Sequence, residues 1–174
     1  RVNRWVVNDR QLFSGFKDIS KGAINKYLPD WVWNLNMEQS KLLLESMVIG
    51  DGHYMKNGTM RYDTSSIKLA NDFQKLALHS GYSANMYIKY KKGHESYSST
   101  RNEIFRQSVD AYRLTIVKSQ NHPLVNKNIK KDKSNAQDYL KHYEGKVYCC
   151  TVPSGIVYVR RNGIPVWTGN SSRH

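Results

Sequence analysis

The chain has 174 residues, of which 39% are hydrophobic and 11% aromatic, enough for one large or two small folded domains and without a window apolar enough to span a membrane. It carries 27 Lys and Arg against 14 Asp and Glu, a formal net charge of +13. That excess is spread along the chain, which favours a polyanionic partner, most simply nucleic acid, over a surface that is basic only for solubility.

The two cysteines are neighbours, Cys149 and Cys150, so they predict neither a disulfide framework nor a zinc site of the usual spacing. No secretory signal is visible, and we therefore expect an intracellular, reducing location, nuclear or cytoplasmic. The chain starts without Met, which suggests a fragment or a processed piece.

Residues 1–35 are basic and aromatic, carry short helical patterns, and are expected to form a lead-in to the first domain. Pro29 breaks any helix before Trp31 and Trp33. Asn36 then predicts a helix start, with Gln39 as its reciprocal partner in a capping box, and the helix is expected to run over residues 37–50.

One face of this helix carries Leu43, Ser46, Met47 and Gly50, spaced i, i+3, i+4 and i+7. The small Ser46 and Gly50 would let the backbone of a second helix approach closely.

Asp51 follows at the C-terminal end of the helix, where the helix dipole disfavours a carboxylate, and a bound metal ion would explain it. We expect Gly52 to end the helix in a left-handed turn. The alternative is an ordinary amphipathic helix that exits through Asp-Gly.

The next segments predict an antiparallel sheet and a second helix. Asn57-Gly58 indicates a hairpin over residues 53–64, and Ser65 or Ser66 caps a helix over residues 67–79 that Gly81 ends. Alternation predicts strands at 83–90 and 111–118, with 104–108 as a partner of the latter, whereas 91–101 is expected to be a polar loop.

The order helix, two strands, helix, two strands predicts an α+β fold whose helices cover one face of the sheet. The open face would be basic and could lie in a DNA major groove. Its candidate DNA-binding residues, and those of the adjoining loop, are Arg61, Lys89, Lys91, Lys92 and Arg113.

A looser, charged stretch at residues 121–141 is the candidate domain boundary. Beyond it, KVYCCTVP, GIVYVRR and IPVWTGN read as short strands separated by Pro153-Ser154-Gly155 and Asn162-Gly163. We expect a small β unit, with Cys150 in its core.

The end of this unit, Gly169-Asn170-Ser171, has its own chemistry. The side-chain nitrogen of Asn170 can attack its own carbonyl carbon, which closes a succinimide and cuts the bond to Ser171; a fold that holds this geometry and donates to the carbonyl oxygen accelerates the step. Gly169 allows close backbone approach, and the Ser171 hydroxyl could first accept an acyl group. In isolation, the same three residues would read as a turn.

Three segments resemble known proteins. LESMVIGDG, residues 44–52, is similar to the nonapeptide of LAGLIDADG homing endonucleases, and YDTSSIKLANDFQKLALHSGYSANM, residues 62–86, to the matching repeat in endonuclease-bearing inteins. KVYCCTVPSGIVYVRRNGIPVWTGNS, residues 146–171, resembles the C-terminal splicing blocks of inteins. The final four residues resemble a stretch in the second-largest subunit of eukaryotic-type RNA polymerases.

The resemblance covers about residues 28–174 and implies four parts: a lead-in from the first half of the endonuclease (1–35), a second LAGLIDADG repeat (36–141, αββαββ), the C-terminal β part of a Hint-type splicing domain (142–170) and C-extein residues (171–174). It implies that the chain is the C-terminal portion of an intein. The implied partners are the N-terminal intein portion, with the first splicing block and first motif copy, double-stranded DNA, and a host RNA polymerase subunit; no membrane is implied.

For the endonuclease, the resemblance implies DNA strand cleavage with Mg²⁺, for which Asp51 would be one ligand. Because the 174 residues hold one copy of the motif, a second carboxylate is expected from a matching helix end. Lys118 and Lys89, near strand ends, are candidates for the basic residue that stabilises developing charge, or are solvated lysines facing DNA.

For splicing, the resemblance implies self-cleavage without a cofactor. Cys149 stands where inteins often have Asp; it could act near a scissile bond, be a nucleophile itself as in the class that also has Thr near the C-terminus, which Thr168 fits, or be a buried strand residue. Gly169 replaces the usual penultimate His, and the upstream block has no His near Val157. Another donor is therefore required, for which Arg160, Arg161 and Thr168 are candidates.

The alternative to an intein is a freestanding or degenerate LAGLIDADG protein. A freestanding endonuclease would not need Asn170, and a DNA-binding module without catalysis would not need Asp51.

Overall fold

The computed structural model of the chain describes residues 8–17, 22–100, 102–118 and 142–169. The chain divides into two compact units, the first made of Arg1–Asn121 with Asn162–Ile164 and the second of His122–Arg161 with Pro165–His174. The predicted boundary at 121–141 lies outside the described residues. Among the helices that are described, none is long and apolar enough to cross a membrane.

The lead-in contains the short helices expected from its sequence: α1 (Arg10–Phe16), η1 (Ala23–Asn25) and η2 (Asp30–Asn34). Pro29 occupies the N-cap of η2, so the break before the tryptophans is confirmed. Val32 in η2 is 1% exposed, which shows that the lead-in contributes to the core of the first unit.

Helix α2 (Met37–Asp51) begins in the predicted capping box. The Gln39 backbone N–H donates to Asn36 Oδ1 at 2.9 Å, and the Asn36 N–H donates to Gln39 Oε1 at 3.1 Å. These bonds satisfy donors that would otherwise be left unpaired at the first turn of the helix.

The prediction of a left-handed turn at Gly52 is wrong. Its φ is −103° and its ψ is −162°, because α2 passes directly into strand β1 (Gly52–Tyr54) without a loop. A Cβ at Gly52 would lie 2.5 Å from the Arg61 carbonyl oxygen and 2.8 Å from that of Val48. The glycine is therefore required by the close approach of helix and strand, not by a left-handed backbone.

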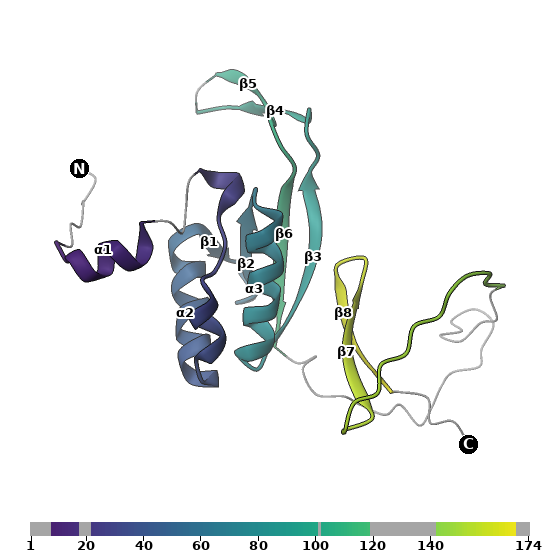
Figure 1. The fold of residues 1–174 in the computed structure, drawn as a ribbon. Coiled ribbons are helices and arrows are strands. Elements are labelled where there is room, and N and C mark those ends of the chain that lie inside the picture. Colours follow the sequence, from purple (N-terminus) through teal and green to yellow (C-terminus); the bar gives the residue numbers. More distant parts are fainter. Residues whose placement is uncertain (1–7, 18–21, 101, 119–141, 170–174) are drawn as a thin grey trace. The chain divides into compact units, whose positions relative to one another are not determined.

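The main sheet has four antiparallel strands in the order β1-β2-β6-β3. Helices α2 and α3 cover one of its faces, as Figure 1 shows. The predicted Asn57-Gly58 hairpin joins β1 to β2, with Gly58 at φ 76°, and the antiparallel sheet with helices on one face is confirmed. The remaining elements of this layer are β2 (Met60–Thr64), α3 (Ile67–His79), β3 (Ser83–Tyr90) and β6 (Ala111–Val117).

The segment between β3 and β6 differs from the prediction. Strands β4 (Glu95–Ser98) and β5 (Glu103–Arg106) pair with each other in a separate two-stranded sheet, so 91–101 is not all loop and β5 is not the partner of β6. Strand β6 instead lies between β2 and β3. Alternation identified β3, β6 and most of β5 but missed β4, and it gave β5 the wrong partner, because pairing depends on residues distant in sequence.

The core lies between the helices and the sheet. Tyr62 of β2 stacks on Phe73 of α3 with ring centroids 4.4 Å apart and an interplanar angle of 8°. Around this pair, the buried hydrophobic residues come from the lead-in, both long helices and three strands: Leu28, Val32, Leu44, Val48, Met60, Leu69, Ala70, Leu76, Ala77, Ala84, Leu114 and Ile116.

The described part of the second unit contains a hairpin of β7 (Ile156–Arg161) and β8 (Ile164–Gly169). Its predicted turn is present, since Asn162 and Gly163 have φ values of 51° and 78°.

KVYCCTVP is wrong as a strand, because residues 142–155 hold no strand and Tyr148 is 86% exposed. No described strand pairs with this segment. Cys149 and Cys150 are both exposed and unbridged, so the expectation that Cys150 is buried is wrong.

Ser66 joins the lead-in to α3. Its hydroxyl accepts from the Leu69 N–H at 3.1 Å and donates to the Lys26 carbonyl at 2.6 Å, and the residue is fully buried. Ser66→Ala should therefore lower the free energy of unfolding by about 1–2 kcal/mol in urea titrations, because it removes an N-cap and leaves the partly buried Lys26 carbonyl without this hydrogen bond. The matched control is Ser65→Ala; an equal loss in both variants would contradict the assignment of the cap to Ser66.

Candidate functional site

The two faces of the sheet differ in character because successive side chains alternate. Tyr62, Leu114 and Met86 are direct partners across β2, β6 and β3 and belong to the helix side. The next row, Asp63, Arg113 and Tyr87, therefore faces the open side. The open face is polar, as predicted.

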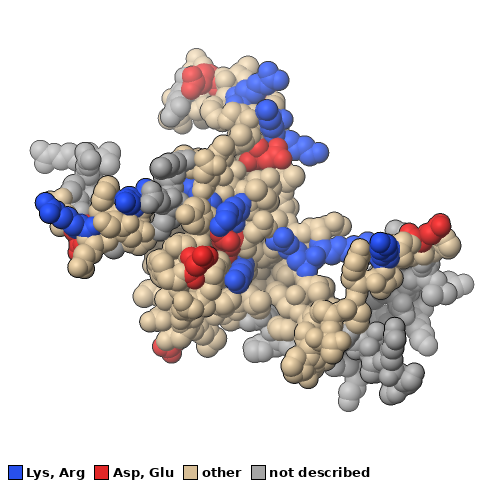
Figure 2. Space-filling model, viewed as in Figure 1, with Lys and Arg blue, Asp and Glu red and all other residues tan. Residues whose placement is uncertain are grey.

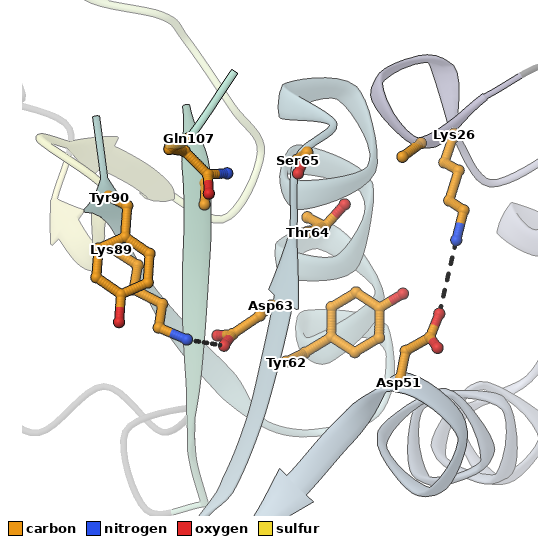
Figure 3. Close-up of a pocket in the computed structure, with 11 residues that line it drawn as sticks. Lys26, Asp51, Tyr62, Asp63, Thr64, Ser65, Lys89, Tyr90 and Gln107 are labelled. Carbon is orange, nitrogen blue, oxygen red and sulfur yellow. Dashed lines mark hydrogen bonds and ion pairs between the residues drawn. The ribbon is translucent and has the colours of Figure 1, made fainter. Parts of the chain in front are cut away.

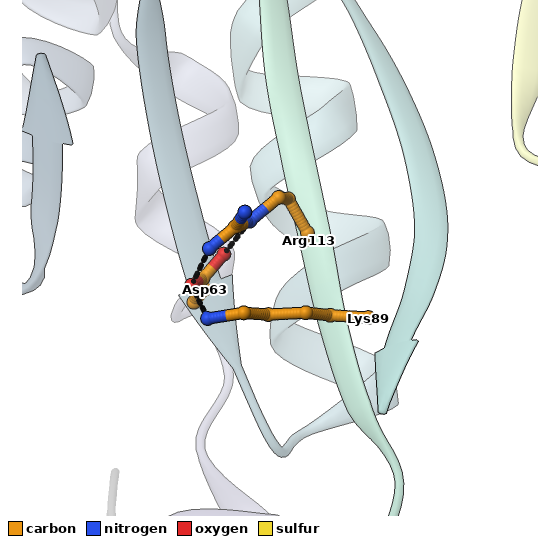
Figure 4. Close-up of polar contacts among 3 residues, drawn as sticks. All are labelled: Asp63, Lys89 and Arg113. Atoms are coloured by element: carbon orange, nitrogen blue, oxygen red, sulfur yellow. Dashed lines mark hydrogen bonds and ion pairs between the residues drawn. The ribbon is translucent and has the colours of Figure 1, made fainter. Parts of the chain in front are cut away.

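Asp63 is the centre of an ion-pair cluster on this open face (Figure 4). Arg113 donates twice to the Asp63 carboxylate, from Nε to Oδ1 and from Nη2 to Oδ2, each at 2.7 Å. Lys89 Nζ lies 2.8 Å from Oδ2 of the same group. This bidentate geometry fixes the orientation of the guanidinium and links three strands through one carboxylate.

The cluster changes the protonation of its members. Partial burial opposes ionisation of Asp63, but hydrogen bonds from Arg113 and Lys89 outweigh it and lower the Asp63 pKa to about 2. The hydrogen bond to Asp63 raises the pKa of Arg113 in turn. Burial, followed by the nearby charge of Asp51, raises the pKa of Tyr62 to about 12. Asp63 is therefore a fixed anion and Tyr62 a neutral phenol at physiological pH.

A pocket of about 340 Å³ lies beside the cluster and contains the carboxylate at the end of α2. Asp51, Asp63, Lys89 and Lys26 all line it (Figure 3). Lys26 Nζ is 3.6 Å from Asp51 Oδ2, and the two side chains are 42% and 65% exposed, so this ion pair is screened by water and contributes little stability.

Lys26 lies in the pocket because the lead-in is bound to α3 by contacts of Lys26 and of the two residues that follow it. The Leu28 N–H donates to the Asp72 carboxylate at 3.0 Å, and Lys68 lies over the Tyr27 ring at 4.1 Å. With the Ser66 bond to the Lys26 carbonyl, these contacts hold the segment around Lys26 at the start of α3.

Asp51 can supply one ligand to a divalent cation. Its carboxylate is 65% exposed, and Lys26 stands beyond hydrogen-bonding distance from it. The other carboxylate of the pocket, Asp63, is occupied by Arg113 and Lys89. In the part of the chain that the structure describes, no group of three or more His, Cys, Asp or Glu could hold a metal ion. The described residues therefore offer one carboxylate ligand in this pocket and do not form a complete metal site.

The outer face of α2 is not covered by the first unit. Leu42 and Ile49 are 67% and 74% exposed, Ser46 and Gly50 are exposed between them, and a Cβ at Gly50 would meet nothing within 4 Å. The predicted face is thus divided: Ser46 and Gly50 are open, whereas Leu43 and Met47 pack partly against the core.

The structure places the other predicted DNA-binding residues around the open face. Arg61 lies on it in β2, and its Nε is buried without a hydrogen-bond partner among the described residues. Lys91 and Lys92 are exposed just beyond β3, toward the β4–β5 hairpin, where Figure 2 shows several basic side chains. Lys118 is exposed and directly follows the last residue of β6. The pocket lies at the other end of β6, where Ala111 lines it, so Lys118 is not part of the pocket.

In the second unit, Thr168 and Gly169 end β8. The Thr168 hydroxyl donates to the Gly169 carbonyl at 3.4 Å. Cys149 lies in the segment without regular structure. Asn170 and Ser171 are outside the described residues.

Of the four charged residues that line the pocket, two were not predicted as site residues from the sequence. Asp63 could have been suspected, because it shares the open face of its strand with Arg61, but its partners depend on the register with β6. Lys26 carried no signal, since nothing in its local sequence indicates a contact with a residue 25 positions away.

The carboxylate at the end of α2 thus lies in the same pocket as Lys89 of the sheet's open face. The model of the LAGLIDADG-like domain family matches residues 38–130, which include α2 from its second residue onward and all four strands of the main sheet, but not the lead-in. The chain belongs to the LAGLIDADG-like domain family.

Two relatives are similar to nearly all of the chain. It is 35% identical over 200 residues to the "DNA-directed RNA polymerase subunit beta C-terminal section" of Stigeoclonium helveticum, covering 97% of this chain and 18% of that protein. It is 28% identical over 256 residues to the "ATP-dependent Clp protease proteolytic subunit" of Chlamydomonas moewusii, covering 97% of this chain and 25% of that one. The chain thus spans a quarter or less of these curated relatives. No solved structure matches it.

The Asp63 cluster predicts a defined acid sensitivity. Since the folded pKa of about 2 is below the ordinary value of 3.8, ionised Asp63 stabilises the fold above about pH 4, and this contribution is lost as the pH falls toward 2. The difference in free energy of unfolding between the wild type and Asp63→Asn should be constant near neutral pH and shrink between about pH 4 and 2. Urea unfolding at a series of pH values measures it; a difference that stays constant down to pH 2 would contradict the cluster.

Proposed function

We propose that this chain is the C-terminal part of an intein, in which one half of a LAGLIDADG homing endonuclease is followed by a splicing segment that cuts itself from Ser171. In this proposal the first unit binds and cleaves double-stranded DNA together with a second motif helix. The second unit severs the chain at Asn170. The host is an RNA polymerase subunit, and the protein acts inside the cell.

One observation carries the intein proposal. The similarity covers 97% of this chain in two relatives whose names denote unrelated proteins, and it occupies 18% and 25% of them. A segment that recurs almost whole inside different proteins is expected of an inserted element. A protein that holds such an insertion in its coding sequence needs a way to remove it, and the Asn-Ser junction supplies the chemistry.

The cut at the C-terminal junction is an internal transfer. The Asn170 side-chain nitrogen attacks the Asn170 carbonyl carbon, the new C–N bond closes a succinimide, and the bond to Ser171 breaks as the Ser171 amine leaves with a proton. Before this cut, the Ser171 hydroxyl accepts the N-terminal acyl group as an ester. The fold's contribution is to hold the amide in attack geometry and to donate to the carbonyl oxygen.

The hairpin β7–β8 is the support for this geometry. Strand β8 runs to Gly169, directly before Asn170, and the hairpin is stiffened by Tyr158 and Trp167, whose ring centroids are 4.7 Å apart. With no His at the penultimate position, the Thr168 hydroxyl is the candidate donor nearest in sequence to the reacting carbonyl. The other two candidates, Arg160 and Arg161, end β7 beside the Asn162-Gly163 turn, at the end of the hairpin opposite Gly169. Cys149 has an exposed thiol that could serve as an acceptor nucleophile.

For DNA cleavage, Asp51 would hold Mg²⁺ together with a carboxylate from a second motif helix packed on the open Ser46 and Gly50 face. When bound, the ion neutralises the phosphate and positions water for attack. The protein's own groups provide the positive charge around it: Lys26 and Lys89 line the same pocket as Asp51. Both are therefore better placed than Lys118 to stabilise charge that develops there.

The splicing proposal predicts the fate of one bond. Incubation of the wild-type chain, alone and with its N-terminal complement, should release the segment that follows Asn170 and leave a succinimide or Asn at the new end, as measured by intact-mass spectrometry. Asn170→Ala removes the nucleophile and should abolish release, whereas Asn126→Ala, in the stretch before the splicing segment, serves as the matched control. Release that continues in Asn170→Ala would rule out this mechanism.

A DNA-binding module without cleavage is the second candidate, because Asp51 is the one carboxylate in its pocket that is open to a metal ion. Together with its N-terminal complement, the wild type should nick DNA only when Mg²⁺ is present, and Asp51→Asn should reduce nicking at least a hundredfold while DNA retention in gel shifts persists. Asp110→Asn is the charge-matched control. Nicking that is equal in wild type and Asp51→Asn contradicts the role of Asp51, and DNA retention without nicking in both supports the binding module.

A further inference from the structure

The four strands of the main sheet contain a single acidic residue, Asp63, against the basic residues Arg61, Lys89 and Arg113. The carboxylate lies on the open face, where it would repel DNA phosphates if that face binds DNA. It also neutralises much of the charge of Arg113 and Lys89. Asp63 therefore weakens general attraction to DNA on this open face, so its presence there requires an explanation other than binding affinity.

The geometry of the cluster offers one. Of the five N–H groups of a guanidinium, Arg113 gives two to Asp63, and Tyr87 is its direct partner across β3 and β6. Lys89 gives one of its three N–H groups to Asp63. The side chains of Arg113 and Lys89 are 16% and 26% exposed, so their remaining N–H groups are held in place and not free to follow a phosphate.

We propose that Asp63 is a specificity-determining residue that holds Arg113 and Lys89 as a fixed pair of donors for a guanine edge in the major groove. The inference rests on the proposed DNA binding. Guanine presents two acceptors there, O6 and N7, whereas adenine and cytosine each expose an amino donor that the donor groups of Arg113 and Lys89 cannot accept. Asp63 acts through its partners and does not touch the base.

Loss of Asp63 should affect general attraction to phosphates and recognition of guanine in opposite directions. Once released, Arg113 and Lys89 can move to phosphates, so binding to arbitrary DNA should tighten and the slope of log K against log salt should steepen by about one to two. At the same time the preference for guanine should fall, because it depends on fixed donors. Removing a carboxylate that only stabilises the sheet would also reduce the repulsion of phosphates, but it would leave the base preference of the folded protein unchanged. The base preference is therefore the measurement that discriminates between the two roles.

The test uses the full chain together with its N-terminal complement, and a library of DNA duplexes with a randomised central segment. Bound duplexes are sequenced, and binding to one arbitrary duplex is titrated with salt. The wild type should enrich guanine at one or more positions. Asp63→Asn should reduce that enrichment about tenfold or more while it tightens binding to the arbitrary duplex.

The matched control is Asp72→Asn, which removes the same charge from α3, on the helix side of the sheet, and should keep the guanine enrichment. Arg113→Lys keeps the charge but loses the two-pronged geometry, so it should lose the enrichment with little change in salt slope. If Asp63→Asn is unfolded by circular dichroism, Arg113→Lys carries the test.

The outcomes distinguish this inference from the function on which it rests. A wild type that binds no duplex overturns the proposed DNA binding itself. A wild type that binds without base preference, or an Asp63→Asn or Arg113→Lys variant that keeps the preference, overturns only the role assigned to Asp63.

Discussion

The direct passage of α2 into β1 is the constraint on which the candidate site depends. No loop separates the last helical residue, Asp51, from the first strand residue, Gly52. The backbone can make this junction only because Gly52 has no Cβ, which would lie 2.5 Å from the Arg61 carbonyl oxygen. Because the helix meets the sheet so closely, its terminal carboxylate lies in the same pocket as residues of β2 and β3, although the dipole of its own helix disfavours it there.

The division of the sheet into two faces decides where charge can be used. The helix side is filled by Tyr62, Phe73 and their hydrophobic neighbours, so polar side chains on the strands must lie on the other side. There a single carboxylate orders two cations through short hydrogen bonds and stays ionised down to a pKa of about 2. A chain with a formal charge of +13 thus combines general attraction to polyanions with one rigid cluster, in which a carboxylate offsets one of two positive charges.

Much of the fold could be predicted because its signals are local. The capping box of Asn36 and Gln39, the Asn57-Gly58 hairpin and the helix after Ser66 are all determined by residues within four positions of each other. The errors share a different cause. The strands β4 and β5 and the segment around Cys149 were misassigned because a strand exists only with a partner, and partners are chosen by contacts between distant parts of the chain.

The amino-acid sequence by itself determined the helix limits, the tight turns, the basic character of the surface and the motif by which the family is identified, since each follows from composition or from neighbouring residues. Only the tertiary structure decided that Lys26 stands beside Asp51 and that Asp63 binds Arg113 and Lys89. Those contacts join residues up to 50 positions apart, and they form because packing of the helices sets which strands are adjacent and in what register.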